Sequence, residues 1–321
     1  MTKKVFFSII IPVRQENDYL RETLAYLKKQ TFKDFEVLVI TDKISKQADP
    51  SFKRNLGAKK AKGEFLCFLD DDSYPKSNWL KNLYTQIKKH PRWAAFCGPT
   101  LTPKNDNVYQ QASGLFWSSF LGSGGAGHYR NFPQKARFVE DYPTVNLTVN
   151  KKVFHQIGGF QSKYWPGEDT ILCLDLINHG EKIYYHPSIQ VYHHRRAVFL
   201  PHLKQISRYA LHRGLFARKF PRTSLKIGYL APSLFLIYLL TLPLHHCLIP
   251  LYLYLTALFF TAIHLLLTIP NLSIYLLILT LITFPITHLY YGLLFIFGFV
   301  KLDLDFKAHE VDKKTGQYIG G

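Results

Sequence analysis

The first half of the chain alternates continuous apolar runs with amphipathic segments. Val5 to Val13 is a β-rich run that suits a strand buried on both faces. In the segment that follows, 17–30, leucines at 20, 24 and 27 recur at helical spacing. The same alternation then predicts strands at 35–41, 64–70 and 93–100 and helices at 51–62 and 78–90. Alternation with short connections indicates an α/β domain with a mainly parallel sheet and right-handed crossovers.

Residues 101–140 interrupt this pattern. They are rich in Gly, Ser and Asn, as in "GSGGAGHYRN", and predict a mobile loop region. Regular structure is expected again from "TVNLTVNKKVFHQIGGF" onward, and "WPGEDTILCLDLINHG" predicts a helix that opens near Glu168. The stretch "KIYYHPSIQVYHHRR" then predicts one further strand that leads out of the domain.

A long apolar segment dominates the second half of the chain. From Ile227 to Val300 there is no Lys, Arg, Asp or Glu. Because about 20 apolar residues span a bilayer as a helix, we expect three membrane helices near 229–246, 248–268 and 273–299. A buried core of a soluble protein would need polar faces that this segment lacks. The last helix contains Pro285 and could bend there into two shorter pieces, which leaves the number of crossings open.

The charge of the chain supports a membrane location. The net charge is +18, and no Asp or Glu occurs between Glu181 and Asp303. The basic stretch 195–226 lies directly before the apolar segment, where it fits the positive flank of a membrane anchor better than a nucleic-acid surface. We therefore expect a multi-pass protein of the cell (inner) membrane with its first domain in the cytoplasm, and no nucleic acid as partner.

The four cysteines argue against a zinc site or a disulfide framework, because they are scattered and form no C-x-x-C pair. A reducing compartment is the natural expectation. The cysteines are Cys67, Cys97, Cys173 and Cys247.

Three consecutive carboxylates follow the strand predicted at 64–70. Like charges at Asp70, Asp71 and Asp72 are costly unless a cation lies among them. Hard cations such as Mn²⁺ and Mg²⁺ prefer carboxylate oxygens, and ligands of parallel sheets bind beyond the carboxyl ends of the strands. Asp42 follows the preceding strand in the same way. The alternative is a solvated acidic turn, and Asp71 could simply cap the turn before Pro75.

Four motifs in order resemble family 2 glycosyltransferases with the GT-A fold. They are "FSIIIPVRQENDYLRETLAYLKKQTFKDFEVLVITD", "RNLGAKKAKGEFLCFLDDD", "IGGF" and "GEDTILCLDL". The resemblance covers about residues 5–200. It implies an inverting sugar transfer from a nucleotide-diphosphate sugar, with Mn²⁺ or Mg²⁺ stabilising the charge of the leaving diphosphate.

The resemblance also implies a nucleotide and metal site. Asp70 would contact the ribose and the metal side, Asp72 would be a direct metal ligand, and Asp42 would recognise the base or ribose. The family's usual "DDGS" is replaced here by "TDKIS", so the base stays open, with a UDP-sugar as the first expectation. The residues assigned to the nucleotide sugar are Pro12, Arg14, Glu16, Asp42, Arg54, Asn55, Asp70 and Asp71.

Asp169 of "GEDT" matches the family's general base, which takes a proton from the acceptor hydroxyl, and Glu168 would orient the acceptor. Acidic residues are also favoured in a first helical turn, and both roles are compatible. His193, 24 residues after Asp169, is the expected third metal ligand, with His194 as the alternative and a structural or acceptor-binding role also open.

A motif after the sheet domain concerns the acceptor. "QISRY" resembles the Q-x-x-R-W element of processive synthases, so Gln205, Arg208 and Tyr209 are assigned to acceptor or diphosphate, together with Trp165. Residues 202–218 also read as a basic amphipathic helix that lies on anionic lipid, and the two roles are compatible. Arg195 and Arg196 would meet diphosphate or lipid headgroups.

The sequence thus predicts four regions: a GT-A domain at 1–200, a basic interfacial helix at 201–226, membrane helices at 227–300 and a polar tail at 301–321. The expected function is sugar transfer to a lipid-linked or glycan acceptor at the cytoplasmic face, for cell-envelope glycan or glycolipid synthesis. A processive polysaccharide synthase subunit and a catalytically inactive membrane scaffold are the alternatives. A nucleotidyltransferase would share the metal logic but not the "GEDT" helix. The oligomeric state is open.

Overall fold

The computed structural model describes residues 5–125, 127–301, 310–311 and 318–319. By their packing, the described residues form two units. The sheet unit contains 5–101 and 133–193, and the helical unit contains 102–132 and 194–301. Residues 310–311 and 318–319 pair as a short antiparallel ladder.

A seven-stranded mixed sheet forms the centre of the sheet unit, in the order β2-β1-β3-β8-β5-β9-β7. Its strands are β1 (Phe7–Pro12), β2 (Phe35–Ile40), β3 (Phe65–Phe68), β5 (Ala95–Cys97), β7 (Arg137–Val139), β8 (Leu147–Asn150) and β9 (Ile183–Tyr185). β8 runs antiparallel to both β3 and β5, and β7 runs antiparallel to β9, while the other neighbours are parallel. The predicted GT-A type of α/β fold with a mainly parallel sheet is confirmed.

The core of this sheet follows from its continuous apolar strands. Every residue of β1 is buried, because β1 lies between β2 and β3 with side chains packed on both faces. Phe7, Ile9 and Ile11 share a cluster with Trp79 and Leu83 of α4. The helices of this unit are α1 (Asp18–Lys28), α2 (Asp42–Ser45), α3 (Pro50–Lys60), α4 (Trp79–Lys89), α8 (Lys151–Gln156) and α9 (Glu168–Asn178), with 3₁₀ turns η1 (Thr144–Asn146) and η2 (Ser162–Tyr164).

A second, three-stranded sheet has the order β4-β10-β6, with β4 (Ser73–Pro75), β6 (Thr100–Leu101) and β10 (Val191–His193). The prediction of one strand over 182–196 is wrong, because β9 and β10 are separate strands in different sheets. A turn at His186 to Gln190 divides them, where the Ser188 amide donates to His186 Nδ1 and the Ile189 amide to the His186 carbonyl.

The helical unit contains α5 (Val108–Ser118), α6 (Phe120–Ser123), α7 (His128–Asn131), α10 (Leu200–Lys219), α11 (Pro221–Ser224), α12 (Ile227–His245), α13 (Ile249–Thr268) and α14 (Ile274–Val300). The prediction of a loop region at 101–140 is wrong. Asn107 and Gln110 form a capping box that starts α5, and its small residues Ala112, Ser113 and Gly114 are buried. Residues 102–132 pack with the helices that follow His193 instead of with the sheet.

Three helices, α12, α13 and α14, are long and apolar enough to cross a membrane. Their ends lie within two residues of the predicted ones at 229–246, 248–268 and 273–299. Pro285 does not interrupt α14, which continues as one helix through it.

Candidate active site

The turn after β3 brings two of the three carboxylates together with a histidine. β4 pairs antiparallel with β10, and this register sets His193 opposite Ser73, next to Asp72. His193 Nε2 lies 3.2 Å from Asp72 Oδ1. One potential ligand atom from each of Asp70, Asp72 and His193 lies within 4.8 Å of the others.

These residues fit a divalent cation. Two carboxylates and an imidazole form an oxygen and nitrogen donor set that suits Mn²⁺ or Mg²⁺. Ligand atoms that share one such ion at about 2.1 Å each lie about 3 Å apart, so small side-chain adjustments would close the cluster. We name Asp70, Asp72 and His193 the acidic cluster.

The middle carboxylate is directed elsewhere. Asn17 Nδ2 donates a hydrogen bond of 2.6 Å to Asp71 Oδ2, and Asn17 also caps α1 by accepting from the Leu20 amide. Burial raises the pKa of Asp71, the hydrogen bond from Asn17 lowers it, and the neighbouring carboxylates Asp72 and Asp70 add to the rise. The contact that the structure gives Asp71 is therefore with the start of α1.

Arg54 joins the acidic cluster to α9. Its Nη2 lies 2.8 Å from Asp70 Oδ1, and its Nη1 lies 2.9 Å from Glu168 Oε1. The side chain is almost fully buried, at 5% exposure. Burial lowers the pKa of Arg54, but the carboxylates of Asp70 and Glu168 outweigh that effect, so the pKa rises. The sequence assigned Arg54 to the nucleotide sugar; in this structure its guanidinium bridges two carboxylates.

α9 opens with the two acidic residues of "GEDT". Glu168 is 5% exposed, and its Oε2 is buried with no hydrogen-bond partner among the described residues. Burial raises the pKa of Glu168, Arg54 lowers it, and Asp169 adds to the rise. Asp169 is half-buried and its Oδ1 accepts a 2.7 Å hydrogen bond from the Thr170 amide, as first-turn acids do.

The ends of β1 and β2 meet at the same edge of the sheet. Pro12 is paired with Ile40, and the Asp42 amide donates to the Arg14 carbonyl at 3.0 Å. Pro12 is buried, whereas Arg14 and Glu16 are exposed.

Lys53 holds this edge together and was not found from the sequence. It forms an ion pair with Asp42, and its Nζ donates to the Val13 carbonyl at 2.9 Å. The side chain is 2% exposed, and burial lowers its pKa while Asp42 opposes that change. Nothing in "FKRNLGA" distinguishes Lys53 from the exposed lysines that follow it on α3.

Asn55 holds the "IGGF" turn. Its Nδ2 donates to the Phe160 carbonyl at 2.8 Å, and its Oδ1 accepts from the Phe160 amide at 2.9 Å. Gly158 and Gly159 have φ of +85° and +72°, which favours glycine at both positions. Both polar groups of Asn55 thus serve the backbone, although the sequence assigned it to the nucleotide sugar.

His193 and His194 have different neighbours. His194 Nδ1 contacts Asp106 Oδ1, and Asp106 Oδ2 also accepts from the Arg195 amide at 3.3 Å. Asp106 is buried and was not found from the sequence. The alternative ligand His194 therefore lies against Asp106 within the helical unit, and His193 belongs to the acidic cluster.

The residues assigned to the acceptor lie in both units. Gln205, Arg208 and Tyr209 are on α10, where Gln205 is exposed and the other two are half-buried. The ring centroids of Tyr209 and Trp117 are 6.2 Å apart, and the Arg213 guanidinium lies 4.9 Å from the centroid of the Tyr209 ring. Trp165 ends the 3₁₀ turn η2 of the sheet unit and is half-buried.

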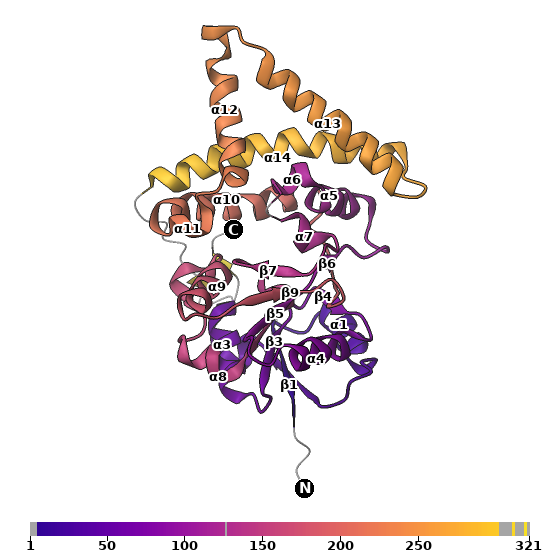
Figure 1. The fold of residues 1–321 in the computed structure, drawn as a ribbon, viewed down its shortest axis with the longest axis vertical. Helices are drawn as coiled ribbons and strands as arrows, with labels where there is room; N and C mark the ends of the chain where they lie inside the picture. Colours follow the sequence, from indigo (N-terminus) through magenta and orange to yellow (C-terminus); the bar gives the residue numbers. More distant parts are fainter. Residues whose placement is uncertain (1–4, 126, 302–309, 312–317, 320–321) are drawn as a thin grey trace. The chain divides into compact units, whose positions relative to one another are not determined.

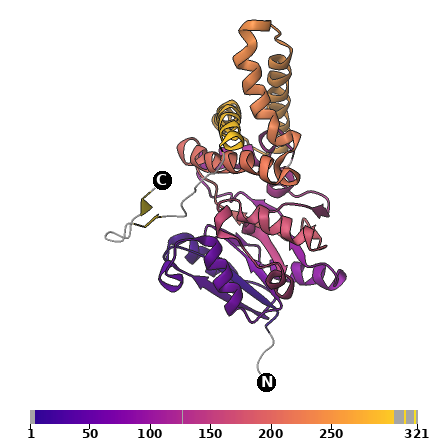
Figure 2. The ribbon, with the colours of Figure 1, turned by 90° about the vertical axis from the view of Figure 1, so that its left-hand side faces the viewer.

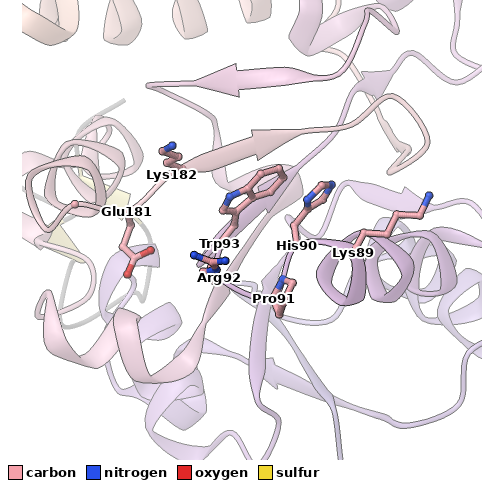
Figure 3. Close-up of a pocket in the computed structure, with 8 residues that line it drawn as sticks. Lys89, His90, Pro91, Arg92, Trp93, Glu181 and Lys182 are labelled. Atoms are coloured by element: carbon pink, nitrogen blue, oxygen red, sulfur yellow. The ribbon is translucent and has the colours of Figure 1, made fainter.

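A pocket lies at the opposite edge of the sheet (Figure 3). It adjoins the amino ends of β5 and β9, which begin at Ala95 and Ile183, whereas the acidic cluster follows the carboxyl end of β3. His90 and Trp93 stack there with ring centroids 3.7 Å apart. Its lining is Lys89, His90, Pro91, Arg92, Trp93, Gly180, Glu181 and Lys182.

The family is decided by matches that cover most of the chain. The model "Glycosyl transferase family group 2" matches residues 65–297, and "Glycosyl transferase family 2" matches residues 8–49. The chain belongs to glycosyl transferase family group 2. It is a glycosyltransferase, as the sequence predicted.

Curated proteins that are similar to this glycosyltransferase have about a quarter of the aligned residues identical to it. A "Dolichyl N-acetyl-alpha-D-glucosaminyl phosphate 3-beta-D-2,3-diacetamido-2,3-dideoxy-beta-D-glucuronosyltransferase" of Methanococcus voltae is 25% identical, over 67% of this chain and 74% of that protein. A "Pre-mycofactocin glycosyltransferase" of Mycobacterium tuberculosis is 27% identical over 46% of this chain; the chain covers only 30% of that protein. A crystal structure of S. aureus TarS with UDP-GlcNAc is 16% identical, covers 99% of both chains and has a TM-score of 0.48.

Proposed function

We propose that this glycosyltransferase moves a sugar from a nucleotide-diphosphate sugar, by inverting transfer, to a lipid-linked or glycan acceptor at the cytoplasmic face of a membrane. Its product would serve cell-envelope glycan or glycolipid synthesis. The observation that carries the proposal is the acidic cluster, which Arg54 connects to the Glu168 carboxylate at the start of α9.

In this proposal Asp70, Asp72 and His193 hold Mn²⁺ or Mg²⁺. When bound, the ion neutralises charge that develops on the leaving diphosphate. Pro12 ends β1, Arg14 and Glu16 follow it, and Asp42 follows β2, so all four lie at the carboxyl ends of the two neighbouring strands, which is where an α/β sheet binds its ligand. That position supports their assignment to the base and ribose.

Asp169 is the proposed general base. It is half-buried in the first turn of α9, next to Glu168, whose position is fixed by Arg54. Its carboxylate would take the proton of the acceptor hydroxyl as that oxygen attacks the anomeric carbon, and one displacement inverts the configuration. Glu168 acts by holding the first turn of α9 in place.

A membrane-embedded acceptor is supported by two observations. Three helices are long and apolar enough to cross a membrane, and the relative from Methanococcus voltae is named for a dolichyl-linked substrate. An enzyme held at the membrane meets a lipid-linked acceptor at high effective concentration. Gln205, Arg208, Tyr209 and Trp165 are the side chains we assign to that acceptor.

The test is nucleotide binding, which needs no knowledge of the acceptor. Binding of UDP, GDP and dTDP to the detergent-purified full chain is measured with and without Mn²⁺, for wild type, Asp72→Asn and Asp175→Asn. Asp175 is a control carboxylate on α9, outside the acidic cluster, that accepts a hydrogen bond from Gln161 Nε2. We expect metal-dependent binding of one nucleotide to wild type. Its affinity should fall roughly 10- to 100-fold or more in Asp72→Asn and should stay near the wild-type value in Asp175→Asn. Absence of nucleotide binding in wild type would overturn the mechanism and favour the inactive scaffold.

A further inference from the structure

The three apolar helices differ in how far the protein covers them. The most apolar stretches of α12 and α13 are only 11% and 6% buried, whereas that of α14 is 56% buried. On α14 the buried positions recur every three or four residues along its whole length, as at Thr280, Phe284, Thr287 and Tyr291. One complete face of α14 therefore packs on protein.

The second half of α14 lies beside α10 from end to end. His202 Nε2 is 3.1 Å from Thr287 Oγ1 near the start of α10, and Arg218 Nη2 donates to the Lys301 carbonyl at 2.7 Å near its end. Between them Gly214 is so close to α14 that an added Cβ would lie 2.1 Å from the Phe295 carbonyl oxygen. Residue numbers rise together in the two helices, so they run in the same direction side by side (Figure 1).

The first half of α14 packs on α5. Phe116 and Phe284 have ring centroids 5.2 Å apart, and the hydroxyl groups of Tyr109 and Tyr275 are 3.2 Å apart. α5 follows a polar stretch with its capping residue Asn107, which is no element of a bilayer interior. Both halves of α14 are thus flanked by segments of the helical unit that are not themselves apolar spans.

α10 cannot cross a bilayer. Arg208 and Arg213 lie near its centre and Lys204, Arg218 and Lys219 lie nearer its ends, and each Lys or Arg near the centre of a membrane helix costs roughly 2.5–3.5 kcal/mol. Because charged side chains occur along the whole of α10, including its centre, a helix that accompanies α10 along its full length stays out of a crossing orientation too.

We propose that α14 lies in the plane of the membrane beside α10, and that α12 and α13 alone cross it. The occupant of the outer face of α14 is then lipid: its exposed positions recur about every four residues along much of the helix and, apart from Tyr275, are apolar. They include Ile274, Ile278, Ile282, Ile286, Leu293, Phe297 and Val300. The basic side chains of α10, in a stretch without acidic residues, suit anionic headgroups at the same depth.

The dimensions of α12 and α13 fit a crossing hairpin. With 19 and 20 residues they are about 28–30 Å long, which matches a hydrocarbon core of about 30 Å. α12 meets α14 near its own start, where Ser233 Oγ donates to the Gly292 carbonyl at 3.1 Å. Further along, Leu240 and Leu244 are exposed. Both views show α12 standing across α14, which is seen end-on in Figure 2.

A chain that crosses the membrane twice and a chain that crosses it three times differ in the side on which the residues after α14 lie. Cys247, between α12 and α13, lies on the far side in both cases. Lys301, after α14, lies on the side of the sheet unit with two crossings and on the far side with three. This inference rests on the membrane location in the proposed function but not on catalysis, so nucleotide binding and topology can fail independently.

Cysteine labelling tests the topology. Cys67, Cys97 and Cys173 are buried and Cys247 is exposed, so the wild-type chain carries its own reporter. Intact cells that express the full chain are treated with a membrane-impermeant maleimide, before and after permeabilisation. In a Cys247→Ala background, Lys301→Cys is compared with Lys59→Cys, an exposed position on α3 that marks the side of the sheet unit.

We expect Cys247 to react in intact cells, and Lys301→Cys and Lys59→Cys to react only after permeabilisation. Labelling of Lys301→Cys in intact cells, to the same extent as Cys247, would show that α14 crosses and would overturn the inference. Protection of both Cys247 and Lys59→Cys in intact cells, together with labelling of both after permeabilisation, would show that the hairpin does not cross, with the same consequence.

Discussion

Removal of the Arg54 guanidinium gives a specific test of the link between the acidic cluster and α9. In Arg54→Met the Asp70 and Glu168 carboxylates lose a shared cation that lies 2.8 and 2.9 Å from them. Glu168 is buried and its second oxygen already lacks a partner among the described residues. Breaking a buried ion pair from one side costs about 3–5 kcal/mol, because a buried charge stays uncompensated.

The loss of stability should depend on pH in a direction that the site dictates. Burial raises the pKa of Glu168 to about 7, against the lowering effect of Arg54. The folded state therefore binds this proton more tightly than the unfolded state, and the free energy of unfolding falls as pH rises from about 4.3 through the raised pKa. Without Arg54 the pKa of Glu168 rises further. The deficit of Arg54→Met relative to wild type should thus be small near pH 5 and largest near pH 8.

The assay is thermal unfolding of the detergent-purified chain at pH 5.5 and pH 8. For a unit of this size, 3–5 kcal/mol corresponds to a fall in Tm of about 6–20 °C at the higher pH. Lys59→Met is the matched control, since it removes an exposed positive charge from the same helix, and its Tm should change little. Glu168→Gln should restore most of the loss in the double variant with Arg54→Met.

Two outcomes would contradict this reasoning. An equal loss at both pH values would mean that Arg54 contributes through packing of its side chain and not through its charge. Additive effects of Arg54→Met and Glu168→Gln would mean that the two groups do not interact, because contacting ionic groups are expected to show coupling of about 0.5–3 kcal/mol.

Two further predictions concern single side chains. Asn55→Ala leaves the amide and carbonyl of Phe160 without their partner, so we expect the free energy of unfolding to fall by about 1–3 kcal/mol per unsatisfied group, measured by thermal unfolding. Asn55→Asp should keep part of the wild-type stability. No change in Asn55→Ala would mean that water replaces the side chain. Burial lowers the pKa of His202 to about 4, so the stabilising contribution of its neutral form is present above about pH 6.5 and is lost as pH falls toward 4. His202→Gln should therefore flatten the decline of Tm over that pH range. An unchanged slope would mean that His202 does not cause the decline.

Features that depend on one strand could be predicted from the sequence. β3 is apolar at every position, and so is β1 apart from the buried Ser8, because both faces of a central strand are covered. The ends of both strands follow from the next polar residues, Arg14 and Asp70. The acidic turn lies at a carboxyl end for the same reason. The family resemblance supplied the role of each carboxylate, which strand patterns do not contain.

Features that depend on distant pairs could not be predicted. His193 lies beside Asp72 only because β10 pairs with β4, and neither three-residue strand has a pattern of its own. Arg54 contacts Glu168 across 114 positions of sequence. The prediction for the segment of α5 was wrong for another reason. Gly, Ser and Asn suggest a loop, but here a small residue of α5 allows a neighbouring segment to approach closely, as at Gly114 against Thr102.

The apolar helices show a limit that composition alone imposes. A helix that packs on protein with one face and on lipid with the other has the same apolar content as one surrounded by lipid, so α14 satisfies the length and hydropathy of a membrane span as fully as α12. The difference lies in the neighbour. Because α10 carries Lys and Arg side chains along its length and accompanies α14 from Thr287 to Lys301, we infer the orientation of the uncharged helix from the charges of the helix beside it.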